Sequence, residues 1–355
     1  MMKANDLTRD FIQVVEDASA RGTALSLIAG GTKAFFGRET DAAPMQLAGH
    51  RGIINYEPKE LVITARAGTP LKEIEAALDE QGQMLAFEPP HFGDTATLGG
   101  TVACGLSGPR RPYAGSARDF VLGCRIINGA GRELRFGGEV MKNVAGYDVS
   151  RLMTGAMGTL GLMLDLSLKV MPKPHTEITL VQERSEADAI RLMNIWAAKS
   201  WPISAAAYDG LKLHVRLCGS AKGVEAARGR IGGDQLEEGH RFWSTLREHQ
   251  HSFFDTGLPL WRLSVASQTP PLGVAGKIFI DWGGAQRWLV TDADAGEVRR
   301  VVAEAGGHAT LFRGGDRSSE VFHPQADAVM MLHRNLKRSF DTRGIFNPGR
   351  LYQEF

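Results

Sequence analysis

Four glycine-rich segments contain the residues of this chain whose types and spacing could do chemistry. They are "IAGGTKAFFG" (28–37), "ATLGGTVACGLSGPRRPYAG" (96–115), "GYDVSRLMTGAMGTLG" (146–161) and "FNPGR" (346–350). Consecutive main-chain N–H groups at the first glycine pair could form a concave site for an anion such as a pyrophosphate. Gly99 and Gly100 would let the main chain approach a flat ligand, because glycine has no side chain to block it. Each segment alone is also compatible with an ordinary structural turn.

Other nucleotide and metal motifs are missing from the sequence. It has no G-x-x-x-x-G-K-[ST], which excludes a P-loop, and no G-x-G-x-x-G after an early strand, which leaves a Rossmann site unsupported. Cys104, Cys124 and Cys218 are far apart and no C-x-x-C occurs, so we expect neither an iron–sulfur cluster nor structural zinc. His249 and His251 follow a charged helix, and we predict no metal there.

Composition and charge bear on two further classes of function. The 355 residues carry 41 Lys and Arg against 40 Asp and Glu, whereas a surface that binds nucleic acid is normally basic. The longest apolar run, 152–164, is too short and too rich in glycine to span a membrane. Charges occur throughout residues 1–22, which argues against a signal peptide, and we expect a cytoplasmic protein.

The elements that must position the glycine segments are short strands and helices. Strands are expected at 25–30, 60–68 and 84–87. A helix is predicted with Thr69 as its N-cap, Pro70 at its first position and Gly82 at its end. Residues 119–136 predict a β-hairpin with Asn128 in the turn.

The pattern changes after two prolines near residue 172. From "EITLVQ" (177–182) to "HATLFRG" (308–314), strands occur in pairs with helices between them. This pattern predicts an α+β domain in which an antiparallel sheet is covered by helices on one face. We therefore place a domain boundary at 172–176.

Taken together and in this order, the segments resemble the flavin-binding domain of the vanillyl-alcohol oxidase/p-cresol methylhydroxylase (PCMH) superfamily. "AGGTK" (29–33) is similar to its pyrophosphate loop, and "RAGTPLKEIEAAL" (66–78) to the strand and helix that follow. "TLGGTVACGLSGPRRPYAGSARDFVLG" (97–123) resembles the second flavin loop. "KNVAGYDVSRLMTGAMGTLG" (142–161) and "FDTRGIFNPGRL" (340–351) resemble the D-lactate and glycolate dehydrogenase branch.

The resemblance implies an α+β fold: a two-lobed PCMH-type FAD-binding domain (1–171), an α+β cap domain (172–329), and a C-terminal segment (330–355) that returns to the FAD domain. FAD is the implied cofactor. Elsewhere in the superfamily a histidine of the pyrophosphate loop binds the flavin covalently; this loop has none, so the FAD should be noncovalent. Ile28 and Ala29 also replace the arginine or serine that usually precedes the glycine pair. The resemblance assigns to FAD the residues Ala29, Gly30, Gly31, Thr32, Lys33, Pro89, Thr97, Leu98, Gly99, Gly100, Thr101, Ala103, Gly105, Gly115, Gly158, Thr159, Leu160, Gly161 and Asn347.

The catalytic residues are not assigned by the resemblance. Catalytic members of the branch carry an H-x-G-D-G-N-x-H type signature in the second domain, which this chain lacks. Oxidation of a 2-hydroxy acid needs a base for the hydroxyl proton, a cation for the carboxylate and a flavin N5 that accepts hydride. Candidate carboxylate ligands are Arg262 and Arg313, and candidate bases are His308 and His323, although the sequence favours a packing or surface role for each. Arg110 and Arg111 either neutralise phosphate or form a solvated turn.

The resemblance implies a subunit of a complex that oxidises glycolate to glyoxylate. The implied partners are a catalytic flavoprotein subunit and an iron–sulfur subunit, with membrane contact only through the complex and no nucleic acid. The flavin would either relay electrons or be structural. Two alternatives stay open: a self-sufficient FAD-dependent 2-hydroxy acid dehydrogenase, and a flavin-free assembly scaffold. Trp261, Trp282 and Trp288 are candidates for a docking surface or for core packing.

Overall fold

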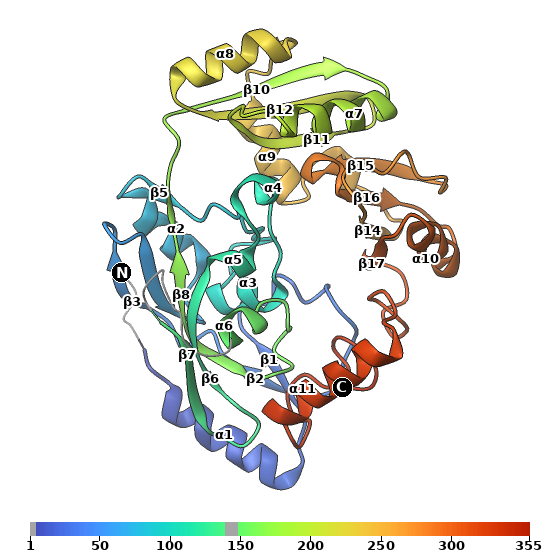
Figure 1. The fold of residues 1–355 in the computed structure, drawn as a ribbon. Helices are drawn as coiled ribbons and strands as arrows, with labels where there is room; N and C mark the ends of the chain where they lie inside the picture. Colours follow the sequence, from blue (N-terminus) through green and yellow to red (C-terminus); the bar gives the residue numbers. More distant parts are fainter. Residues whose placement is uncertain (1–4, 139–147) are drawn as a thin grey trace. The chain divides into compact units, whose positions relative to one another are not determined.

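The chain is organised in two units, each assembled from separate segments (Figure 1). The computed structural model describes residues 5–138 and 148–355. Unit 1 contains Met1–Leu106, Ser116–Pro172 and Arg317–Phe355, and unit 2 contains Ser107–Gly115 and Lys173–Asp316. Two features differ from the expected division: 107–115 belongs to unit 2, and the chain returns to unit 1 at Arg317.

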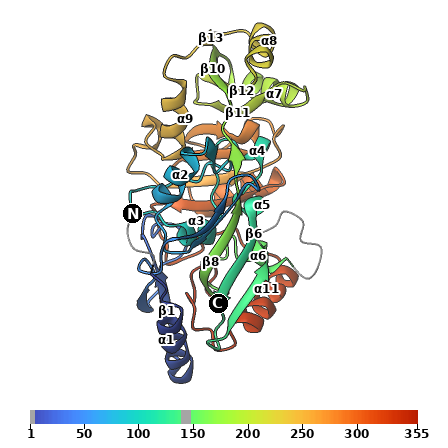
Figure 2. The ribbon, with the colours of Figure 1, turned by 90° about the vertical axis from the view of Figure 1, so that its left-hand side faces the viewer.

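Unit 1 is built around an antiparallel sheet in the order β3-β4-β8-β6-β7, in which β6 and β8 lie side by side (Figures 1 and 2). Its strands are β3 (Ile53–Glu57), β4 (Val62–Arg66), β6 (Val121–Ile127), β7 (Glu133–Gly137) and β8 (Leu162–Lys169). The predicted hairpin is confirmed: β6 and β7 pair, and Asn128 closes their turn by accepting hydrogen bonds from the N–H groups of Ala130 and Arg132. Two short pairs complete the strands, β1 (Leu25–Ile28) with β2 (Ala43–Gln46) and β5 (Gln83–Met84) with β9 (Met171–Pro172).

Helices complete unit 1 beside these strands. They are α1 (Thr8–Arg21), α2 (Leu71–Asp79), α3 (Leu98–Cys104), α5 (Ala117–Phe120), α6 (Val149–Leu152) and α11 (Asp327–Phe340). Phe11 and Val15 of α1 share a core with Leu25 of β1 and with Phe346 of the C-terminal segment. That core fixes the start of β1 beside the last residues of the chain.

The start of α2 differs from the prediction. Pro70 rather than Thr69 is the N-cap, and it makes no side-chain cap. The Thr69 hydroxyl instead accepts a hydrogen bond of 2.9 Å from the N–H of Gly52, and Thr69 is fully buried. Its polar group therefore satisfies a neighbouring loop. The expected strand at 84–87 is also shorter, because pairing ends at Met84.

Unit 2 is an eight-stranded antiparallel sheet in the order β13-β10-β12-β11-β15-β16-β14-β17. Its strands are β10 (Thr176–Glu183), β11 (Ile203–Tyr208), β12 (Lys212–Gly219), β13 (Asp234–Gln235), β14 (Leu260–Ser264), β15 (Lys277–Asp281), β16 (Gln286–Val290) and β17 (His308–Arg313). Its helices are α4 (Arg111–Ala114), α7 (Glu186–Ala197), α8 (Ala221–Ile231), α9 (Gly239–Arg247) and α10 (Ala295–Glu304), with short turns η1 (Ser252–Phe254) and η2 (Trp282–Gly284).

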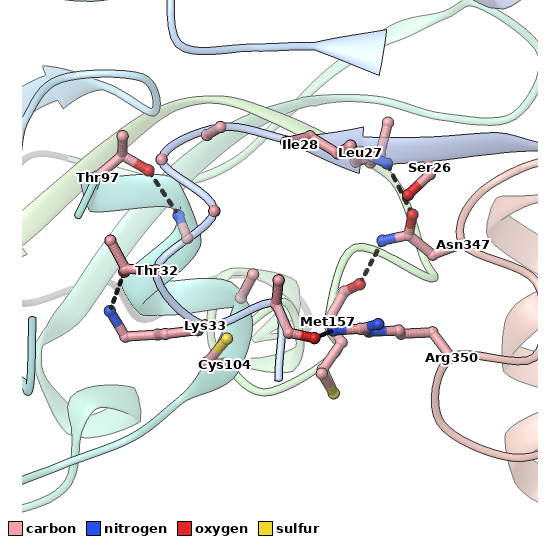
Figure 3. A pocket seen from close by; sticks show the side chains of 16 residues that line it. Ser26, Leu27, Ile28, Thr32, Lys33, Thr97, Cys104, Met157, Asn347 and Arg350 are labelled. Carbon is pink, nitrogen blue, oxygen red and sulfur yellow. Dashed lines mark hydrogen bonds between the residues drawn. The ribbon is translucent and has the colours of Figure 1, made fainter. Parts of the chain in front are cut away.

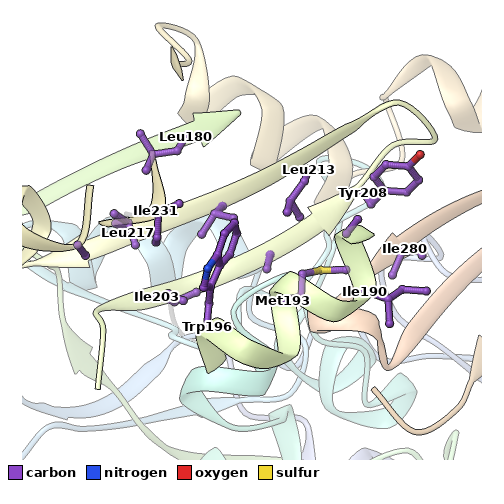
Figure 4. Packing of buried hydrophobic residues seen from close by; sticks show 14 of the residues in the cluster. Leu180, Ile190, Met193, Trp196, Ile203, Tyr208, Leu213, Leu217, Ile231 and Ile280 are labelled. Carbon is purple, nitrogen blue, oxygen red and sulfur yellow. The ribbon is translucent and has the colours of Figure 1, made fainter. Parts of the chain in front are cut away.

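Alternation along β12 explains how this sheet is covered. Leu213, Val215 and Leu217 point to one face, where they join a buried cluster that includes Met193 and Trp196 of α7 (Figure 4). Burial of each such side chain contributes about 1.5–3 kcal/mol. The intervening side chains meet α9 on the other face: His214 stacks on Phe242 at 3.9 Å, and the Arg216 guanidinium lies 5.2 Å from the ring of Trp243. The expected antiparallel sheet with helices is confirmed, but helices contact both of its faces.

Candidate functional site

All four glycine-rich segments contribute to the lining of one cavity in unit 1 (Figure 3). Its cavity volume is about 220 Å³, and the hollow continues into solvent at the mouth. The lining residues are Ser26, Leu27, Ile28, Ala29, Gly30, Gly31, Thr32, Lys33, Ala34, Thr97, Gly100, Ala103, Cys104, Met157, Asn347 and Arg350.

The first segment enters the cavity where β1 ends. The two glycines of this segment, Gly30 and Gly31, have different roles. A Cβ on Gly30 would lie 1.7 Å from the carbonyl oxygen of Thr95, so glycine is required there by the protein's own main chain. Gly31 has φ +69°, and a Cβ there would meet no atom within 4 Å. Of the two, Gly31 faces open space.

The second segment forms the short helix α3, whose N-cap is Thr97. The Thr97 hydroxyl accepts a hydrogen bond of 3.2 Å from the N–H of Gly100. Gly100 lines the cavity, whereas a Cβ on Gly99 would lie 2.7 Å from the Cβ of Ala67. Gly99 therefore allows α3 to pack on the chain after β4, and Gly100 is the glycine of this pair that borders the cavity.

The fourth segment closes one wall through Asn347. Its Oδ1 accepts a hydrogen bond of 2.8 Å from the N–H of Leu27, and its Nδ2 donates one of 2.6 Å to the carbonyl of Met157 (Figure 3). Asn347 is buried and has φ +43°, a left-handed conformation that asparagine tolerates better than most residues. One amide thus connects β1 to the third glycine segment at the cavity wall.

Two cations border the cavity and face a thiol. Lys33 Nζ donates to the carbonyl of His91 at 3.1 Å, and Arg350 donates to the carbonyls of Arg38 and Ala34 at 2.8 Å each. Burial raises the pKa of the Cys104 thiol, and the charges of Lys33 and Arg350 oppose that shift. Two cations beside a turn of main-chain N–H groups suit an anion, and Gly31 and Gly100 leave room for a flat group. This donor set fits FAD, which carries both a diphosphate and an aromatic ring.

Nine of the residues assigned to FAD from the sequence line the cavity: Ala29, Gly30, Gly31, Thr32, Lys33, Thr97, Gly100, Ala103 and Asn347. The others have different positions. Pro89, Leu98, Thr101, Thr159 and Leu160 are buried outside the lining. Gly99, Gly105, Gly158 and Gly161 lie close to main-chain or side-chain atoms of the protein itself, and Gly115 belongs to unit 2.

Sequence reasoning missed Ser26, Leu27, Ile28, Ala34, Cys104, Met157 and Arg350 as lining residues. Five of these residues stand inside the glycine segments, so proximity to the glycines was the available signal: Ile28, Ala34, Cys104, Met157 and Arg350. Residues 139–147, which include all of "KNVAGY" (142–147), lie outside the described residues.

The candidate catalytic side chains are divided between the units. His323 belongs to unit 1, and Arg262, Arg313 and His308 belong to unit 2. In the sheet of unit 2, Arg262 pairs with Thr310, and His308 pairs with Ser264 at the exposed start of β17. Burial, together with the nearby charge of Arg111, lowers the pKa of Arg262 to about 10.

Arg110 and Arg111 both belong to unit 2, and each has a partner there. Arg110 is buried and donates to the Glu177 carboxylate at 3.1 Å and to the Cys218 sulfur at 2.9 Å. The Arg111 guanidinium lies 4.3 Å from the ring of Trp282. A solvated turn is therefore wrong for Arg110.

Burial decides the role of two of the three tryptophans that were candidates for a docking surface. Trp261 and Trp288 are 3% and 5% exposed, so both are core residues of unit 2 and not docking residues.

Within residues 5–138 and 148–355, no three His, Cys, Asp or Glu side chains are grouped as metal ligands would be. In the same described ranges, no helix has both the length and the apolar character needed to cross a bilayer.

The sequence of this chain is similar to those of several known proteins. Residues 7–137 match the FAD binding domain family. The chain is 47% identical over 354 residues, 100% of both proteins, to the glycolate oxidase subunit GlcE of Escherichia coli (strain K12). It is 32% identical over 152 residues to the glycolate oxidase subunit GlcD of Bacillus subtilis (strain 168), which covers 42% of this chain and 32% of that protein.

A solved structure of alkyldihydroxyacetonephosphate synthase has the same fold. Its TM-score is 0.69, with 15% identity, over 97% of this chain and 76% of that chain. At this identity the likeness supports the fold alone, and it confirms the expected fold class. The 47% identity over the full length shows the family of the chain, which the fold alone does not show. This chain belongs to the family of the glycolate oxidase subunit GlcE.

Proposed function

We propose that this chain is the FAD-binding subunit of a complex that oxidises glycolate to glyoxylate, and that it holds FAD noncovalently in the cavity of unit 1. The observation that carries the proposal is the convergence of four glycine-rich segments, far apart in the sequence, on one cavity. The full-length identity to a glycolate oxidase subunit supports the substrate class. The match of residues 7–137 to an FAD binding domain supports the cofactor.

The residues of the cavity have distinct roles in this proposal. Lys33 and Arg350 offset the charge of the diphosphate, since cations close to an anion favour its charged form. Gly31 and Gly100 leave volume for the ligand, and Asn347 holds the wall between β1 and Met157. When bound, FAD supplies a two-electron acceptor.

The proposed partners are a catalytic flavoprotein subunit and an iron–sulfur subunit. The relatives named as glycolate oxidase subunits support an assembly of several chains. The chain would lie on the cytoplasmic side and meet the membrane only through its partners. The flavin would then either pass electrons between subunits or stabilise the assembly.

One observation favours a second candidate, a self-sufficient 2-hydroxy acid dehydrogenase. In the described part of the chain, the Arg262 guanidinium has no hydrogen bond or ion pair. Burial lowers its pKa to about 10. A recessed cation without a counter-ion suits a carboxylate. A base is still needed: His308 is exposed at a strand end, and His323 belongs to the other unit. The candidates therefore do not form a complete set within one unit.

The absorbance spectrum of the purified chain tests the cofactor. We expect flavin bands after expression or after reconstitution with FAD. A protein that binds no FAD in a titration would contradict the proposal and would favour the flavin-free scaffold. Substrate oxidation is a separate question, which anaerobic mixing of the FAD-loaded chain with glycolate tests.

A further inference from the structure

We propose that the buried ion pair of Lys337 and Asp341 positions the FAD cavity by holding Asn347 in its wall. The inference rests on the proposed function of that cavity. Lys337 is on α11 and Asp341 ends this helix, and neither side chain lines the cavity. Both therefore act through other residues, as positioning residues.

The Lys337 ammonium joins three separate points of unit 1. Its Nζ donates to the Asp341 carboxylate at 2.7 Å, to the carbonyl of Thr159 at 2.7 Å and to the carbonyl of Phe346 at 2.8 Å. An ammonium has three N–H donors, so all of them are used. Burial lowers the pKa of Lys337, and the carboxylate of Asp341 opposes that shift.

The Asp341 carboxylate shapes the turn that leads to Asn347. Oδ1 accepts a hydrogen bond of 3.0 Å from the N–H of Ile345, and Oδ2 accepts one of 2.8 Å from the N–H of Phe346. The hairpin turn of β6 and β7 makes room for this group, because a Cβ on Gly129 would lie 2.3 Å from Asp341 Oδ1. One carboxylate thus binds two successive N–H groups of the turn that precedes Asn347.

This turn delivers Asn347 to β1. The N–H of Leu25 donates to the carbonyl of Ile345 at 2.7 Å, and the N–H of Asn347 donates to the carbonyl of Leu25 at 2.9 Å. The Asn347 side chain then bonds Leu27 and Met157. Met157 lies two residues before Thr159, so Lys337 and Asn347 both connect the C-terminal segment to the third glycine segment. Lys337 makes this connection behind the cavity wall, and Asn347 makes it within the wall.

Stability alone does not account for a charged pair at this place. The Lys337 and Asp341 side chains are 5% and 0% exposed, and an apolar pair of similar volume is often as stable as a buried ion pair. An apolar pair would leave the N–H groups of Ile345 and Phe346 without their acceptors. The ion pair therefore defines one conformation of the turn, and preorganisation of a site favours binding.

The test is the FAD affinity of the full-length chain, measured by titration of the apoprotein. Lys337→Met should raise the Kd for FAD by about tenfold or more. Leu78→Ala is the matched control, because Leu78 is fully buried on α2 in unit 1 and does not line the cavity. It should lower the Tm and leave the Kd near the wild-type value. An equal Kd for Lys337→Met and wild type, or an equal loss in both variants, would overturn the inference.

A double-mutant cycle identifies the route of the effect. Asn347→Gly removes the side-chain amide and accepts the positive φ. Lys337→Met should change the Kd little when it is added to Asn347→Gly, because both changes remove the same wall. Additive losses would overturn the inference. Asp341→Asn replaces Lys337→Met if the latter does not fold, with the same expectations. Wild-type protein without FAD affinity would instead contradict the proposed function.

Discussion

The side-chain oxygen of Asn347 accepts a hydrogen bond of 2.8 Å from the main chain of Leu27, which lies 320 positions earlier in the sequence. The contact shows that the C-terminal segment, which follows unit 2 in the sequence, completes unit 1. It also makes the cavity depend on the last residues of the chain, since Arg350 lines it as well.

Truncation after Ser339 should lower FAD affinity and thermal stability together. The deletion removes Asn347 and Arg350 from the cavity, and it removes Ile345 and Phe346, which are buried in the core with α1 and β1. Loss of such core side chains costs about 2–5 kcal/mol each. FAD titration and thermal unfolding measure the two effects. Unchanged affinity in the truncated protein would exclude the C-terminal segment from the site.

Gly100→Trp should abolish FAD binding while the fold survives. Its Cβ would meet only the Thr97 hydroxyl, at 3.2 Å, so the indole would extend into the cavity. Gly229→Trp is the matched control, because Gly229 is exposed on α8 and a Cβ there meets no atom within 4 Å. Circular dichroism should be alike in both variants, and FAD content should fall only in the first. Wild-type FAD content in Gly100→Trp would show that the ligand lies elsewhere.

Gly99→Ala should act on stability instead. The added Cβ would lie 2.7 Å from that of Ala67, and overpacking of this kind costs about 1–3 kcal/mol. We expect a lower Tm, and FAD titration at low temperature should still reach full occupancy. A Tm equal to that of the wild type would contradict the packing role of Gly99.

Bound FAD should be released by acid. Among the described residues no histidine lines the cavity, and the first glycine segment contains none. Precipitation with acid should leave yellow colour in the supernatant, as absorbance near the flavin maximum records. Colour that stays with the pellet would demonstrate a covalent bond.

Alkylation of Cys104 should report on occupancy of the cavity. Burial raises the pKa of this thiol, so at neutral pH the unreactive thiol dominates and the rate should increase as the pH rises. FAD should slow the reaction, because Cys104 lines the cavity. Mass spectrometry of the Cys104 peptide after iodoacetamide treatment measures this rate. Cys124 is the internal control: it is buried with a pKa of about 12 and lies outside the FAD cavity. Equal rates at Cys104 with and without FAD would contradict the site.

The elements of the fold could be predicted from local patterns, and the cavity could be predicted only in outline. The hairpin at Asn128 follows from turn residues, and the strands of unit 2 follow from alternation. The roles of paired glycines could not be separated, because the difference between Gly99 and Gly100 depends on Ala67 in another element. Thr69 was expected as a cap for the same reason: its buried partner, Gly52, is distant in sequence.

Buried charges were the least predictable part of the site. Lysine is rarely buried unless it is paired, yet Lys337 is 4% exposed. Its three acceptors come from segments that meet only in the folded chain. Trp261 and Trp288 show the converse case, since tryptophan is common both at interfaces and in cores and only the sheet register decides.

Anaerobic stopped-flow mixing tests most directly whether this chain oxidises substrate by itself. The purified, FAD-loaded chain is mixed with excess glycolate, and separately with D-lactate. A flavin without a positioned base loses proton transfer worth about 10²–10⁴-fold, and without a carboxylate clamp it also loses orientation of the substrate. We predict that the flavin absorbance of the isolated chain stays oxidised, and that addition of the partner subunits allows glycolate to reduce it. Rapid, saturable bleaching by glycolate in the isolated chain would contradict the account and would establish a self-sufficient dehydrogenase.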